Sequence, residues 1–138
     1  MKSIVDEAII DRLKNYGSGI IVVTKVESTI PLYKAVTIQN TLPIYFTIRK
    51  KSNPTLRRMT NEYEFGVDLL DIAEYLEHGV SLIFFIDLDI RQVFHITLSH
   101  LMEHGREYRG KGFPHGILFI PLTKLEKLGV PLEPHLIV

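Results

Sequence analysis

The residues from 80 to 88 constrain the fold more than any other part of the sequence. Their central run, Leu82 to Ile86, consists of five consecutive large apolar side chains. A strand with this composition is apolar on both faces, and such strands lie in the interior of sheets that are covered on both sides. We therefore expect residues 80 to 88 to form a central strand of a mixed sheet, paired with residues 92 to 98.

Other segments build an α/β order around that strand. The spacing of apolar residues predicts helices over residues 4 to 16 and 67 to 78, the second ending at Gly79. Strand-like runs cover residues 20 to 26, 33 to 39, 42 to 49 and 116 to 121, and the first three predict an antiparallel meander. A short helix is expected to begin the polar stretch 99 to 112, and another to begin after Thr123. The expected order is α-β-β-β-α-β-β-(α)-β-α, a central mixed β-sheet flanked by helices in a single domain over residues 1 to 138.

Composition excludes several classes of protein. The chain has no cysteine, which rules out disulfides, thiolate catalysis and cysteine-bound metals, and favours the cytoplasm. Its start does not have the long apolar stretch of a signal peptide, and no run approaches the ~18 apolar residues of a membrane span. We therefore expect a cytoplasmic protein that does not enter a membrane.

Charge is balanced overall but segregated along the chain. Sixteen basic residues offset sixteen acidic ones, so the whole molecule has no field that would attract nucleic acid. Residues 49 to 58 nevertheless hold five cations and no anion, whereas residues 62 to 77 hold six anions and no cation. The two segments predict either a basic binding face or a solvated basic loop that is partly paired with the acidic helix after it.

The order of elements, with an early Glu7 in the first helix, resembles the core of the PD-(D/E)XK nuclease superfamily. The similarity covers about residues 4 to 122 and is greatest to compact members, the archaeal Holliday-junction resolvases. This resemblance implies a restriction-endonuclease-like fold. In such enzymes an Asp of the second strand and an acid of the third strand hold a divalent metal, and a Lys two residues after that acid positions the attacking water.

The residues at those positions depart from the family pattern. The helix Glu corresponds to Glu7, but the Asp position holds Lys34 and the acid-x-Lys positions hold Thr47 and Arg49. A Lys in place of a metal-binding Asp changes the local charge by two units and repels the ion. The resemblance therefore implies a degenerate active site with no metal cofactor; migrated ligands such as Glu27, with Mg, remain the alternative.

Binding is the function that could survive in such a domain, with DNA or a protein as the partner. Phosphate groups of a nucleic acid would meet cationic side chains, and each contact would add affinity that falls with salt. The candidate binding residues are Lys34, Arg49, Lys50, Lys51, Arg57 and Arg58. Because the resolvases are dimers, we also expect a homodimer, with the apolar segment 80 to 98 as a possible sheet edge or interface.

A second motif points to a different chemistry. His100, Glu103 and His104 spell H-x-x-E-H, which resembles the zinc site of the inverzincin peptidases. On a helix the two His would share one face and could bind Zn, with Glu103 as general base. The known peptidases have a larger catalytic domain, so an exposed helix or loop with no metal is the simpler interpretation, and a zinc hydrolase is the alternative.

Overall fold

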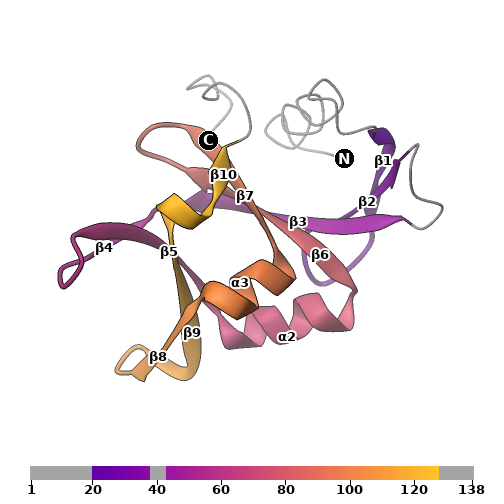
Figure 1. Ribbon diagram of the computed structural model, residues 1–138. Coiled ribbons are helices and arrows are strands. Elements are labelled where there is room, and N and C mark those ends of the chain that lie inside the picture. Colours follow the sequence, from indigo (N-terminus) through magenta and orange to yellow (C-terminus); the bar gives the residue numbers. More distant parts are fainter. Residues whose placement is uncertain (1–19, 38–42, 128–138) are drawn as a thin grey trace.

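A six-stranded mixed sheet forms the centre of the computed structural model, which describes residues 20–37 and 43–127 (Figure 1). Its strand order is β1-β2-β3-β6-β7-β10. The strands are β1 (Ile20–Val26), β2 (Leu32–Thr37), β3 (Ile44–Ser52), β6 (Val80–Asp87), β7 (Gln92–Thr97) and β10 (Glu126–Lys127). The first three are antiparallel neighbours, and β3 is parallel to β6. The predicted mixed sheet and its opening meander are therefore confirmed.

The central position of β6 is also confirmed. This strand lies between β3 and β7 and is antiparallel to β7. Ile83 and Phe85 point into one hydrophobic cluster and Phe84 and Ile86 into another, and all four are fully buried. Because β6 has a partner strand on both sides, it offers no free edge, and the expectation that segment 80 to 98 supplies a dimer edge is corrected for this strand.

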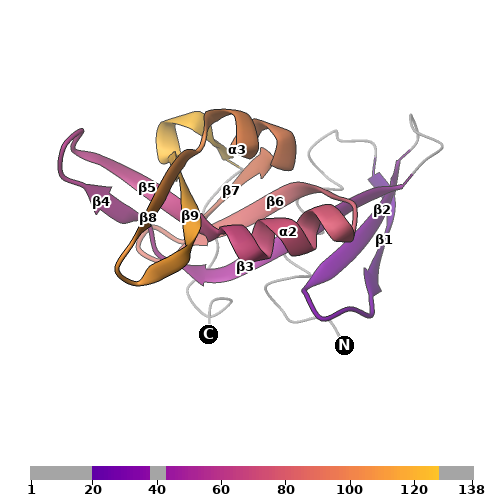
Figure 2. The same cartoon turned by 90° about the horizontal axis from the view of Figure 1, so that it is seen from below.

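Two helices cover one face of the sheet (Figures 1 and 2). Helix α2 (Leu69–Glu77) begins at Asp68, whose side chain accepts a hydrogen bond from the Leu70 backbone, and it is followed by Gly79 at φ 72°. That positive φ is open to glycine without steric cost, so the chain can turn into β6. Helix α3 (Leu98–His104) is capped by Thr97. The expected helix over residues 4 to 16 lies outside the described residues.

A second sheet of four strands, ordered β4-β5-β9-β8, was not predicted. Its strands are β4 (Thr55–Arg57), β5 (Glu62–Asp68), β8 (Arg106–Gly110) and β9 (Phe113–Pro121). One hydrophobic cluster fills the space between the two sheets and includes residues of both helices. In that cluster Phe65 of β5 stacks on Phe85 of β6, with ring centroids 4.7 Å apart. Within the described residues no helix is long and apolar enough to cross a membrane.

The predicted helix after Thr123 is wrong. A 3-10 turn, η1 (Leu122–Lys124), is followed by β10, in which Glu126 lies opposite His95 of β7. No side chain caps the start of the 3-10 turn. Leu125, which follows the turn, is buried in the core. Pairing with β7 satisfies backbone groups that a short uncapped helix would leave unpaired.

Candidate functional site

The segment Thr47 to Arg49 lies in β3, and alternate side chains of this strand face α2. Phe46 and Ile48 belong to the cluster on the far side of the sheet, so Thr47 and Arg49 point toward the helix. Both are therefore brought together on the covered face, as their spacing in the sequence predicts. Thr47 is 1% exposed, whereas the Arg49 side chain is 26% exposed.

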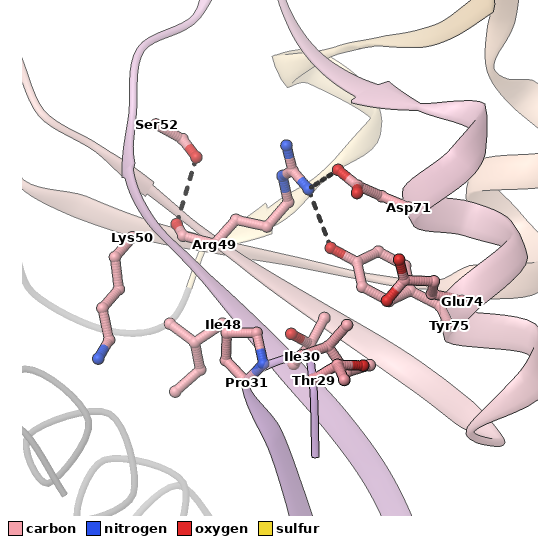
Figure 3. Close-up of a pocket in the computed structure, with 11 residues that line it drawn as sticks. Thr29, Ile30, Pro31, Ile48, Arg49, Lys50, Ser52, Asp71, Glu74 and Tyr75 are labelled. Carbon is pink, nitrogen blue, oxygen red and sulfur yellow. Dashed lines mark hydrogen bonds and ion pairs between the residues drawn. The ribbon is translucent and has the colours of Figure 1, made fainter. Parts of the chain in front are cut away.

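Arg49 is held by two side chains of α2 (Figure 3). Its Nη1 atom lies 3.1 Å from Asp71 Oδ2 and donates a hydrogen bond of 2.9 Å to the Tyr75 hydroxyl. Asp71 and Tyr75 are four residues apart and share one face of the helix. The Nε and Nη2 atoms have no hydrogen-bond partner in the described part of the chain, so one edge of the guanidinium remains available.

Burial and charge act in opposite directions on this pair. Burial alone would lower the pKa of Arg49, but Tyr75 and Asp71 outweigh it and the pKa is raised. Burial raises the pKa of Tyr75, which Arg49 only partly offsets. Arg49 therefore stays charged and Tyr75 stays neutral over the whole physiological range.

A pocket of about 390 Å³ surrounds this pair. Between them, the turn after β1, strand β3 and helix α2 supply hydroxyl groups, two carboxylates and two cations. The lining residues are Thr29, Ile30, Pro31, Thr47, Ile48, Arg49, Lys50, Ser52, Asp71, Glu74 and Tyr75 (Figure 3). The pocket is therefore polar and charge-balanced, with both carboxylates on its α2 wall.

Thr47 is the unusual member of this lining. Its Oγ1 atom is buried and has no hydrogen-bond partner among the described residues. The hydroxyl is near enough to Tyr75 to lower the pKa of that phenol slightly, but it does not meet hydrogen-bonding geometry. A buried hydroxyl without a well-formed hydrogen bond lowers stability, so this position is not optimised for stability.

The other predicted nuclease positions lie apart from the pocket. Lys34 of β2 is half-buried and pairs with Tyr45, whereas it is Leu32 that lies opposite Thr47. Glu27 is exposed and does not line the pocket. Glu7 lies outside the described residues. Among the described residues, Thr47 and Arg49 are therefore the predicted nuclease positions that line the same pocket.

Apart from Lys34 of β2, the basic candidates follow one stretch of chain. Lys50 and Lys51 follow Arg49 in β3, Arg57 ends β4, and Arg58 begins the turn that leads to β5. The predicted pairing of this stretch with the acidic helix is confirmed for Arg49 and Asp71. Arg57 and Arg58 form no ion pair within the described residues.

The H-x-x-E-H motif lies on α3, as a helical site requires. The rings of His100 and His104 are 4.2 Å apart, and His104 Nε2 lies 3.9 Å from a Glu103 carboxylate oxygen. Within residues 20–37 and 43–127, however, no three His, Asp or Glu side chains are arranged to hold a metal ion. The zinc site therefore stays a prediction that has no third ligand in this region.

Sequence reasoning missed Asp71, Glu74 and Tyr75 as members of a site. All three lie in a helix that was predicted from its apolar stripe, and its carboxylates were interpreted only as part of an acidic segment. Their spacing of three and four residues was the available signal, because it places polar groups on one face of the helix. Only contact with Arg49 reveals which face that is.

Comparison with known proteins supports the fold. No protein-family model and no curated protein matches the sequence. The structure is similar to that of a nuclease from a fusselovirus, with a TM-score of 0.54 and 9% sequence identity, over 88% of this chain and 79% of that chain. At this level of identity the similarity shows a nuclease-like fold.

Proposed function

We propose that this chain is a nuclease-like domain of the PD-(D/E)XK type that has lost hydrolysis and binds nucleic acid. The observation that carries the proposal is the environment of Thr47 and Arg49. At the position where the resemblance requires a metal-binding acid, the chain has the buried hydroxyl of Thr47. At the position where it requires a free Lys, the chain has Arg49, which is paired with Asp71. On β3, a divalent ion would meet a hydroxyl and a guanidinium at the positions where the resemblance places an acid and a free Lys.

Two observations support a nucleic acid as the ligand. The structurally similar protein is a nuclease, and the core order of three antiparallel strands, a helix and a parallel strand matches the resemblance. In addition, Lys50 lines the pocket and Lys51, Arg57 and Arg58 come after it along the chain, and cations in such a row contact phosphates irrespective of base sequence.

Gel-shift titration tests the proposal. Labelled four-way junction and plain duplex DNA would be titrated at two salt concentrations, with Mg²⁺ and Mn²⁺ added in parallel cleavage lanes. We expect binding that weakens with salt, and no cleavage. Alanine at Lys50, Lys51, Arg57 and Arg58 should abolish binding. Alanine at four exposed cations elsewhere should not, and these control positions are Lys25, Arg109, Lys111 and Lys124. If the protein binds neither DNA, a protein becomes the expected partner. If it cleaves DNA, the proposal that hydrolysis has been lost is wrong.

A metal-dependent hydrolase is the second candidate, because Asp71 and Glu74 line the same pocket as the unpartnered Thr47 hydroxyl. Such a site would use carboxylates on α2 in place of those expected on β2 and β3. Metal-dependent cleavage that Glu74→Gln abolishes would establish it. Elemental analysis of the purified protein separates this candidate from a zinc hydrolase built on His100, Glu103 and His104, which should retain zinc.

Self-association also follows from the resemblance to dimeric resolvases. The buried position of β6 removes that strand from any interface, so a homodimer would need another surface. A dilution series followed by light scattering should show a dimer that dissociates at low concentration. A monomer at every concentration would contradict the proposed homodimer.

A further inference from the structure

The hairpin of β4 and β5 forms an arm that projects from the body of the molecule (Figures 1 and 2). Thr55, Leu56 and Arg57 of β4 pair with Glu64, Tyr63 and Glu62 of β5, and β4 is the edge strand of its sheet. The arm's tip is the turn from Arg58 to Asn61, all of whose residues are exposed. Asn61 has φ 53°, a left-handed conformation that Asn tolerates, so the turn is tight and defined.

Apolar side chains are exposed on this arm at three places. Met59 at the tip is 88% exposed, and Leu56 and Tyr63, directly opposite each other, are 42% and 52% exposed. None of the three belongs to either hydrophobic core cluster. Single exposed apolar residues are common, but three on one short ribbon, with a Met at its end, indicate a contact surface.

The charge at the tip favours a polyanionic partner. Residues 55–64 of the arm hold two cations, Arg57 and Arg58, and two anions, of which Glu64 is buried and paired with Arg106. Glu62 faces Arg57 across the hairpin, but neither Arg57 nor Arg58 is engaged in an ion pair in the described part of the chain. A second copy of this chain would bring like charges together at the tip, whereas a polyanion would be attracted. An apolar tip flanked by Arg and Asn side chains is the composition with which minor-groove binders unstack a base step.

We propose that this arm enters the minor groove of duplex DNA, where Met59 wedges against a base step and Arg57 and Arg58 contact phosphates on either side. The proposal rests on the proposed nucleic-acid binding and names its binding element and ligand. B-form DNA is the ligand because its backbone and stacked bases can bend around such a wedge. Unpaired strands offer no base stack to open in this way.

The test measures affinity for a fully paired duplex, for the same duplex with one mismatch, and for the corresponding single strand. Wild-type protein should bind the mismatched duplex most tightly, because unstacking there costs least, and the single strand most weakly. Met59→Ala should lower affinity for the paired duplex about tenfold and remove the preference for the mismatch. Met102→Ala is the matched control, because Met102 on α3 is also exposed. It should change neither the affinity for the paired duplex nor the preference for the mismatch.

The arginines are tested through the salt dependence of binding. Arg57→Ala with Arg58→Ala should reduce the slope of log affinity against log salt by about 2. The control pair, Arg109→Ala with Lys111→Ala on the other hairpin, should leave the slope unchanged. If the wild-type protein and the arm variants bind duplex DNA equally well, the proposed role of the arm is wrong, whereas the proposed nucleic-acid binding is retained. If wild-type protein binds no DNA, the proposed function fails as well.

Discussion

Among single residues, Thr47 has a buried hydroxyl group that lowers the stability of the fold. Its buried hydroxyl has no partner among the described residues, so removing the oxygen removes a desolvation penalty. Thr47→Val should therefore raise the free energy of unfolding by about 1 kcal/mol in urea denaturation. The matched control is Thr97→Val, which removes the oxygen that accepts from the His100 backbone at the start of α3 and should cost about 1 kcal/mol. A loss of stability in both variants would contradict the interpretation of Thr47.

The ion pair of Arg49 with Asp71 has measurable coupling. Both side chains are partly exposed, at 26% and 44%, so solvent screens the interaction and a value of about 1 kcal/mol is expected. A double-mutant cycle with Arg49→Met and Asp71→Asn, followed by denaturant unfolding, would give that coupling. Additive effects of the two substitutions would show that Tyr75 alone holds the guanidinium.

His95 gives the folded protein a dependence on acid. Burial lowers its pKa below the ordinary value of 6.5, and Glu126, 3.8 Å away, offsets this only partly. The unfolded chain then binds more protons than the folded one, so stability is lost as the pH falls through about 6.5 toward the folded pKa. His95→Gln should flatten the unfolding free energy between about pH 7 and pH 5, whereas His115→Gln at an exposed position should not. Equal slopes in wild type and His95→Gln would refute this role.

Among the helices and strands, the sequence predicted those whose side-chain pattern repeats within the element itself. The run from Leu82 to Ile86 identified a central strand because burial on both faces leaves an unmistakable composition. Helix α2 was predicted through its apolar stripe and Gly79, and Asp68 starts it within two residues of the expected position. These signals require no knowledge of the partner element.

The second sheet escaped prediction because its strands depend on long-range pairing. One interpretation of the basic residues 49 to 58 was a solvated loop, yet they include the end of β3 and the whole of β4. The alternation of Tyr63, Phe65 and Val67 was the available signal for β5, but it merges into the periodicity of the following helix. The Arg49 contacts to Asp71 and Tyr75 were hidden for the same reason, since they join segments separated by that hairpin.

The second sheet also supplies a test of its own packing. A Cβ atom added to Gly66 of β5 would lie 2.6 Å from Ile117 Cδ1 and 3.0 Å from Phe119 Cε1 of β9. Gly66→Ala should therefore push these side chains aside and cost about 1–3 kcal/mol, measured by thermal or urea unfolding. Thr60→Ala in the exposed hairpin turn is the control and should change stability by less than about 0.5 kcal/mol. No effect at Gly66 would mean that β5 and β9 pack less closely.

In the whole molecule, strand β3 connects the pocket around Arg49 with the arm formed by β4 and β5. Thr47 and Arg49 form one wall of the pocket, and the same strand continues through Lys50 to Ser52 into the arm. The Nε and Nη2 edge of Arg49 is suited to donate to a phosphate oxygen, so the pocket would contribute to the proposed binding.

The proposed loss of metal binding can be tested on the intact protein through its thermal stability. A ligand that binds only the folded state raises the free energy of unfolding, by about 2.7 kcal/mol at a concentration of 100 times Kd. Because Arg49 neutralises Asp71, Mg²⁺ and Mn²⁺ should leave the Tm of the wild-type protein unchanged. Thr47→Asp would add a third carboxylate to Asp71 and Glu74 in the same pocket, and this variant should gain several degrees in Tm with Mn²⁺. A variant that is destabilised without metal but recovers with it still meets the expectation. A metal-dependent rise in the wild-type Tm would instead show that the pocket already binds the ion, and would favour the hydrolase over the binding module.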